Sequence, residues 1–116
     1  MAKTSMTEPS VRRGEIWWVA FDPTLGGEIR KTRPAVIVSN NDANKHQNRA
    51  QVVPLTSRPT PVRSWEARII SQGREHKALA DQIRTVAKAR LRERIGRVTA
   101  DEMEAIERAL RIQLAL

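Results

Sequence analysis

Cysteine is absent from this chain of 116 residues, and only 3% of its residues are aromatic, with no tyrosine among them. Without cysteine the chain can use no disulfide bond or thiolate, so a reducing compartment, the cytoplasm, is expected. No apolar run approaches the roughly 20 residues of a membrane-spanning helix, so no membrane contact is expected. The polar N-terminus also lacks the apolar segment of a secretory signal, and we interpret residues 1–11 as a disordered tail.

Sequence motifs for nucleotides and metal ions are missing as well. The chain contains no phosphate-binding loop, no dinucleotide glycine fingerprint and no cluster with metal-ligand spacing. Its two histidines, His46 and His76, stand in separate polar stretches, and their spacing gives no support to a paired-histidine ribonuclease. We interpret both as surface residues and expect neither a cofactor nor a metal ion.

Positive charge is what the chain has in excess. It carries 21 lysines and arginines against 13 acidic residues, a formal net charge of +8. A polyanion is therefore the expected partner, either a nucleic acid or an acidic protein. The length predicts one domain with a single modest core, which we place at residues 12–116.

The most informative stretch runs from Gly26 to Asn40. Its glycines and charged residues lead directly into Ala35-Val36-Ile37-Val38, an apolar and mostly β-branched run that predicts a buried strand. Arg33 stands at the junction, and the proline that follows it favours an extended backbone there. An arginine held in this way can direct a rigid fork of donors at a phosphate, although a charge run is more often a solvated loop.

Short β-strands are predicted along most of the chain. The predicted strands cover residues 15–21, 35–38, 52–57, 65–70, 79–86 and 94–98. Pro54 indicates that the third of these lies at a sheet edge or carries a bulge. Polar loops are predicted over residues 58–63 and 71–77, with helical turns at 42–46 and 87–91.

A C-terminal helix is predicted after these strands. Thr99 and Glu102 form a capping box at its start. Apolar residues then recur at helical spacing, at Met103, Ile106, Leu110 and Leu114. Short strands followed by one late helix predict a mainly β fold with helices (α+β), built as a compact barrel or a small twisted sheet.

Polar residues beside predicted strand ends are the candidates for chemistry. They are Arg33, Thr56 and Ser57, with Gln82 and Arg84 in the fifth predicted strand. Cationic donors and a hydroxyl suit a phosphodiester, where negative charge develops on phosphate oxygens during reaction. Spacing alone favours the interpretation of Thr56-Ser57 as an ordinary transition from strand to loop.

A set of short motifs in a fixed order makes the interpretation more specific. The motifs are Arg13-Gly14-Glu15-Ile16-Trp17, Asp22-Pro23, Gly26, Glu28, Arg33 to Asn40, Val53 to Ser57, Asp81 to Thr85 and Ile95 to Val98. Together they resemble the MazF/PemK family of toxin endoribonucleases, from Arg12 to the C-terminus. The resemblance implies an SH3-like barrel with a C-terminal helix.

The resemblance also assigns roles to residues. It matches the family's catalytic arginine to Arg33 and its catalytic threonine to Thr56. Supporting or RNA-binding roles follow for Glu28, Arg30, Lys31, Ser57, Arg58, Gln82 and Arg84. The loop from Gly26 to Lys31 carries more charge than the commonest form of this family, which leaves the recognised RNA sequence open.

The activity that the resemblance implies is metal-independent cleavage of single-stranded RNA at specific sequences. The 2′-hydroxyl attacks the adjacent phosphorus, which gives a 2′,3′-cyclic phosphate and a 5′-hydroxyl. No residue stands out as the general base. The implied partners are a second copy of the chain and an acidic antitoxin. Any autoregulation by DNA binding would occur only through the antitoxin.

Two other functions compete with this interpretation. A gyrase poison of the CcdB type shares the fold but depends on a tryptophan near the C-terminus, whereas this chain ends in Ile112-Gln113-Leu114-Ala115-Leu116. A barrel that binds nucleic acid without cutting it is consistent with the composition. The matches at Arg33 and Thr56 argue against it.

Overall fold

The computed structural model describes residues 8–21 and 32–116, and the statements below concern these residues. Its strands are β1 (Glu15–Ala20), β2 (Thr32–Ile37), β3 (Arg49–Thr56), β4 (Glu66–Ser71), β5 (Arg74–Leu79), β6 (Arg84–Ala87) and β7 (Leu91–Arg97). Its helices are α2 (Asn41–His46) and α3 (Ala100–Leu114), with 3-10 turns η1 (Ala80–Gln82) and η2 (Lys88–Arg90). Val11 is 5% exposed and belongs to the core, so packing begins just before the expected domain boundary.

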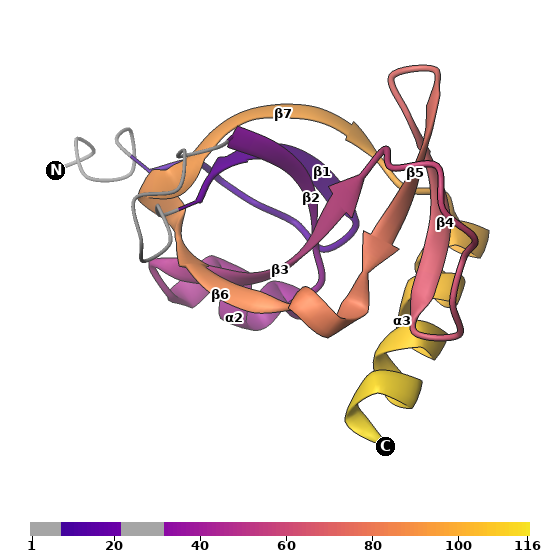
Figure 1. The fold of residues 1–116 in the computed structure, drawn as a ribbon. Coiled ribbons are helices and arrows are strands. Elements are labelled where there is room, and N and C mark those ends of the chain that lie inside the picture. Colours follow the sequence, from indigo (N-terminus) through magenta and orange to yellow (C-terminus); the bar gives the residue numbers. More distant parts are fainter. Residues whose placement is uncertain (1–7, 22–31) are drawn as a thin grey trace, which may run out of the picture.

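The described strands form one antiparallel sheet that curls on itself (Figure 1). Its order is β4-β5-β3-β2-β1-β7, and β6 pairs with β3 outside this path. β3 belongs to both parts of the curled sheet. Its residues Arg49–Val52 pair with β6 in one part, and Leu55 and Thr56 pair with β5 in the other. The structure confirms a mainly β barrel-like fold with a C-terminal helix.

The sheet buries apolar side chains on both faces. Because successive side chains of a strand point to opposite sides, β1 contributes Trp17 and Val19 to one core cluster and Ile16 to the other. Five of its six residues are buried, which confirms the predicted strand with little solvent exposure. The first cluster fills the ring of β1, β2, β3, β6 and β7, and the second lies under α3.

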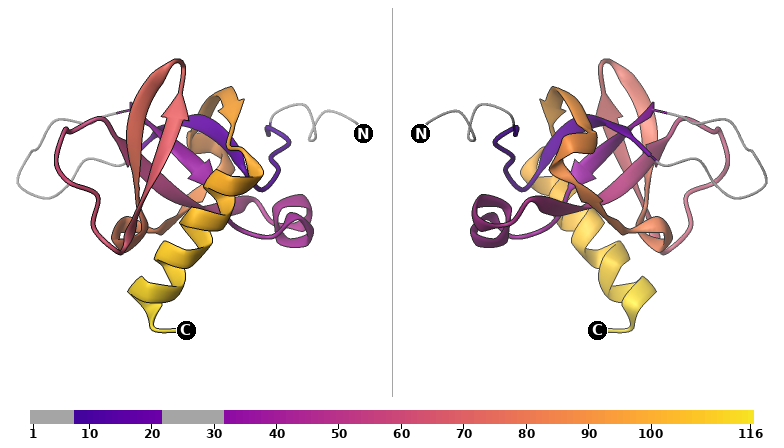
Figure 2. Two further views of the ribbon diagram at one scale, coloured as in Figure 1. Left: turned by 90° about the vertical axis from the view of Figure 1, so that its right-hand side faces the viewer. Right: turned by 90° about the vertical axis from the view of Figure 1, so that its left-hand side faces the viewer.

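Helix α3 covers the second cluster and begins as predicted. Thr99 accepts the backbone N–H of Glu102, and the Glu102 carboxylate accepts the backbone N–H of Thr99. Ile106 is fully buried, and Met103 packs beside it. Leu114, however, is 49% exposed, so the predicted apolar stripe stops packing before the helix ends. Both views of Figure 2 show this end of α3 projecting past the strands.

The region after β4 differs from the prediction. Residues 71–77 were expected to be a polar loop, but they form a tight turn at Gln72-Gly73 followed by β5. Both turn residues have positive φ, 51° and 73°, which suits the twist of a two-residue hairpin. The predicted strand over 79–86 is also wrong, because η1 interrupts it and only Arg84–Ala87 form β6. The turn predicted at 87–91 is confirmed as η2.

Pro54 lies inside the sheet rather than at its edge. The Gln51 carbonyl accepts from the N–H of Val38, so the odd-numbered residues of β3 direct their polar groups toward β2. Pro54 therefore directs its nitrogen to the other side, between Val52, which pairs with β6, and Leu55, which pairs with β5. A residue without an N–H is tolerated there because the partner strand changes at that point.

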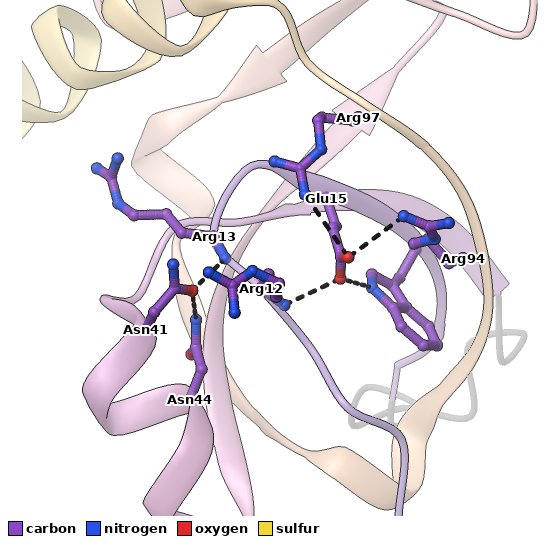
Figure 3. Close-up of polar contacts among 8 residues, drawn as sticks. Arg12, Arg13, Glu15, Asn41, Asn44, Arg94 and Arg97 are labelled. Carbon is purple, nitrogen blue, oxygen red and sulfur yellow. Dashed lines mark hydrogen bonds and ion pairs between the residues drawn. The ribbon is translucent and has the colours of Figure 1, made fainter.

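The motif around Gly14-Glu15 is an anchor for the ends of β1, β2 and β7. Gly14 has a φ of +92°, and its N–H donates to the carbonyl of Ile37. The Glu15 side chain is 6% exposed, and one of its oxygens accepts the N–H of Arg12 at 2.9 Å and the indole N–H of Trp17 at 3.0 Å (Figure 3). Its other oxygen lies 3.4 Å from Arg94 and 3.9 Å from Arg97.

We expect Glu15→Ala to lower the free energy of unfolding by about 2–4 kcal/mol, because the buried indole N–H of Trp17 and the part-buried backbone N–H of Arg12 lose their acceptor. The ion pairs of Glu15 with Arg94 and Arg97 add little to this stability, since the arginine side chains are 55% and 53% exposed and screened by water. Urea unfolding measures the effect, with Glu93→Ala on the exposed side of β7 as a control. Equal stability of the two variants would show that Glu15 does not hold these strands together.

Candidate active site

A hollow of about 430 Å³ opens between the two parts of the curled sheet. Its volume falls within the range of small-molecule sites, about 300–1,000 Å³. Its described lining residues are Trp18, Arg33, Pro34, Leu55, Thr56, Ser57, Ser71, Gln72, Arg74 and His76. They come from β1, β2, β3, β4 and β5, from the residue that follows β3, and from the turn between β4 and β5.

The hollow continues the second core cluster toward the open end of the sheet. Residues two positions apart share a face, so Trp18 follows Ile16, and His76 lies on the face of Ala78. Pro34, Leu55 and Ser71 likewise each lie two positions along β2, β3 and β4 from a residue of the second core cluster, and so share its face. The hollow therefore has an apolar floor next to the second core cluster, and the other lining residues, which are polar, surround it.

Arg33 and Thr56 meet at the rim of this hollow. They stand at the start of β2 and the end of β3, and the register that pairs Ala35 with Pro54 places them opposite one another two residues further on. Thr56 Oγ1 accepts the backbone N–H of Arg58 at 3.2 Å, which leaves the hydroxyl hydrogen to be donated elsewhere. Within the described ranges, no carboxylate pairs with Arg33.

The loop after Thr56 is held to β5 by a buried ion pair. Lys77, directly across from Thr56, is 7% exposed, and its ammonium lies 3.6 Å from Glu66 Oε1 and contacts the hydroxyl of Thr60. The same Glu66 oxygen accepts the backbone N–H of Arg63 at 2.9 Å. This network fixes residues 58–66 beside the hollow.

The other predicted site residues fall in three places. Ser57 lines the hollow, and Arg58 follows it as an exposed residue beside the rim. Gln82 in η1 and Arg84 in β6 are exposed and do not line it; Arg84 sits across from Val52 with its guanidinium 5.0 Å from the ring of Phe21. Glu28, Arg30 and Lys31 lie outside the described residues, as do Gly26 and Gly27.

Sequence reasoning missed the contribution of the β4–β5 hairpin. Gln72, Arg74 and His76 all line the hollow, and the interpretation of His76 as an exposed loop residue is wrong, since it is half-buried in a strand. The signal that was available is the glycine of Gln72-Gly73, a turn former directly after a segment of largely alternating polarity.

The chemistry of the lining suits a phosphate group. Arg33 and Arg74 supply positive charge that persists at any working pH, and Thr56, Ser57 and Ser71 supply hydroxyl groups. The part of the chain that the structure describes holds no group of three acidic or histidine residues that could bind a metal ion. It also contains no helix long and apolar enough to span a membrane.

Comparison with known proteins gives a consistent result. Residues 12–114 match the family model described as PemK-like, MazF-like toxin of type II toxin–antitoxin system. The chain is 40% identical over 115 residues to endoribonuclease MazF9 of Mycobacterium tuberculosis, covering 91% of this chain and 98% of that protein.

Solved structures resemble the whole fold. An endoribonuclease in complex with its cognate antitoxin, from a mycobacterial species, superimposes with a TM-score of 0.76 at 28% identity, covering 91% of this chain and 96% of that one. MazF from Deinococcus radiodurans gives a TM-score of 0.79 at 25% identity, covering 94% and 100%.

Proposed function

The chain belongs to the PemK-like, MazF-like family of type II toxins and is a toxin endoribonuclease; on this premise, we propose that the hollow is its cleavage site. There it cuts single-stranded RNA at specific sequences, without a metal ion. The observation that carries this proposal is the meeting of Arg33 and Thr56, from two adjacent strands, at the rim of a polar hollow. Such an enzyme would meet its substrate in the cytoplasm.

The reaction follows from what these side chains can donate. The 2′-hydroxyl of the substrate attacks the adjacent phosphorus, the bond to the 5′-oxygen breaks, and a 2′,3′-cyclic phosphate and a 5′-hydroxyl result. Arg33 stabilises the negative charge that builds up on the phosphate oxygens, because a fixed donor at that position costs no reorganisation during the reaction. Thr56 donates its hydroxyl hydrogen to the same phosphate, since the backbone N–H of Arg58 fixes its oxygen.

The remaining residues contact RNA outside the reacting phosphate. Ser57 and Arg74 hold a second phosphate or sugar oxygen from within the hollow. Arg58 and Arg63, on the braced loop beside the rim, follow the RNA backbone. The contacts proposed for Glu28, Arg30, Lys31, Gln82 and Arg84 rest on the resemblance of their motifs alone.

Cleavage in the presence of excess EDTA tests the reaction type. We expect the purified chain to cut naked RNA at full rate in EDTA and to leave 2′,3′-cyclic phosphate and 5′-hydroxyl ends. Sequencing of the RNA ends, with and without prior enzymatic removal of the cyclic phosphate, reads both results. A loss of activity that a divalent ion restores would overturn the metal-free scheme, and 3′-hydroxyl ends would overturn attack by the 2′-hydroxyl.

We propose an acidic antitoxin and a second copy of this chain as its protein partners. The net charge of +8 favours an acidic polypeptide, and a similar mycobacterial endoribonuclease was solved with its cognate antitoxin. A disordered acidic segment that folds on binding would compete with RNA for the hollow. Simultaneous saturation of the protein by a non-cleavable RNA and the antitoxin would rule out a shared site, and a monomeric mass in solution would rule out the dimer.

A further inference from the structure

The side chain of His76 occupies the boundary between the core and the hollow. It is half-buried in β5, pairs with Ile69 across the β4–β5 ladder, and shares the face of the buried Ala78. Its chain neighbours Glu75 and Lys77 point to the opposite face, where they form ion pairs with Arg68 and Glu66 of β4. The imidazole of His76 is therefore directed into the hollow that Arg33 and Thr56 border.

A backbone contact fixes which nitrogen of this ring carries the proton. Nδ1 of His76 lies 3.1 Å from the carbonyl oxygen of Arg74. A carbonyl oxygen only accepts, so Nδ1 must be the donor. In the neutral ring, the lone pair then lies on Nε2, which is the nitrogen available to take a proton from another molecule.

His76 is also the one described lining residue that can act as a base near neutral pH. Arginines stay protonated, and hydroxyl and amide groups do not accept a proton under these conditions. No carboxylate is among the described residues that line the hollow. Among the described residues, the charged groups that line the hollow with His76 are Arg33 from β2 and Arg74 from β5, while β1, β3 and β4 contribute only uncharged residues.

We propose that His76 is the general base of the cleavage reaction, a step that rests on the proposed function of the hollow. Nε2 takes the proton of the 2′-hydroxyl as its oxygen forms a bond to phosphorus. The bond from phosphorus to the 5′-oxygen breaks, and the leaving oxygen takes a proton from water. The imidazolium then returns its proton to solvent, so neither an oxidant nor a co-reactant is consumed.

Replacing His76 with glutamine tests this role, because glutamine keeps polarity and size but cannot take the proton. We expect kcat/KM for a short RNA to fall by about 10²–10⁴-fold. The decline of the wild-type rate at acid pH should also disappear in His76→Gln. An RNA with a 2′-O-methyl group at the cleavage position, which binds but is not cut, should bind both proteins with affinities that differ by no more than a few-fold. His46→Gln, on the exposed side of α2, is the control and should leave the rate unchanged.

A substrate with sulfur in place of the leaving 5′-oxygen separates a base from an acid. Because a thiolate leaves without protonation, the defect of His76→Gln should persist with this substrate; its disappearance would make His76 the acid and overturn the proposal. Retention of the acid decline in His76→Gln would also overturn it, by showing a merely structural role. If His76→Gln does not fold, His76→Ala with added imidazole replaces it, and the rate should rise with the concentration of neutral imidazole; no rise would overturn the proposal.

The outcome also distinguishes this step from the site itself. Normal cleavage by His76→Gln beside an inactive Arg33→Ala would overturn the role of His76 and leave the hollow as the cleavage site. Normal cleavage by both variants would overturn both.

Discussion

Arg33→Ala is expected to lower kcat for RNA cleavage by about 10²–10³-fold, the usual cost of removing one fixed donor from a developing negative charge. Arg33 is half-buried at the start of β2, beside Pro34 and across from Thr56, and it lines the hollow, where its fork of donors can reach a bound phosphate. Single-turnover cleavage at saturating enzyme measures the rate of the chemical step separately from RNA binding. The folded state should change little, because Arg33 lies outside both core clusters.

Two further substitutions make the result specific to Arg33. Arg108→Ala removes the same charge from the exposed face of α3, away from the hollow, and should cut RNA at the wild-type rate. Arg33→Lys keeps the charge but loses the planar fork, so we expect it to recover only part of the lost rate. Cleavage by Arg33→Ala within a few-fold of wild type would remove Arg33 from the mechanism.

Thr56→Val should lower kcat by about 10–10²-fold, since it replaces the hydroxyl by a methyl group of similar shape and so removes a single donor to the phosphate. Thr56 is the last residue of β3 and only partly buried, so the methyl group should be accommodated without a large loss of stability. Single-turnover kinetics and thermal unfolding, measured on the same preparation, separate the two effects.

Thr56→Ser is the matched control, because it keeps the hydroxyl that accepts from the Arg58 N–H. We expect it to retain most of the activity. A Thr56→Val protein that unfolds at working temperature but cuts at the normal rate when cooled would show that Thr56 is structural.

The parts of the fold that were predictable are those whose pattern depends on one local rule. β-Branched and aromatic residues predicted buried strands at β1 and the second half of β2, and the capping box and helical spacing predicted α3. The β4–β5 hairpin was missed because Arg74, Glu75 and His76 are polar, and polar residues in series resemble a loop. Only their pairing with β4 shows that they form a strand.

The candidate site was predictable in the same uneven way. Arg33, Thr56 and Ser57 stand beside strand ends that the sequence reveals, and the structure brings them to one hollow. His76 and Arg74 reach that hollow through the curl of the sheet, which no local pattern encodes. Gln82 and Arg84 were placed with the site because one continuous strand was predicted where η1 separates β5 from β6.

The alternative of a gyrase poison loses its basis once the relationships are known. The family model covers residues 12–114, and the curated relative at 40% identity is an endoribonuclease. The polar lining of the hollow also suits a phosphodiester, as two arginines and three hydroxyl groups meet there.

The most direct test of the account is a crystal structure of the chain with an RNA that lacks the 2′-hydroxyl at the mapped cleavage position. Such an RNA binds but cannot react, because the attacking oxygen is missing. We predict that its phosphate lies in the hollow, with the Arg33 guanidinium and Thr56 Oγ1 at about 2.7–3.2 Å from its oxygens. An RNA bound to another face, with the hollow vacant and Arg33 far from every phosphate, would contradict the account.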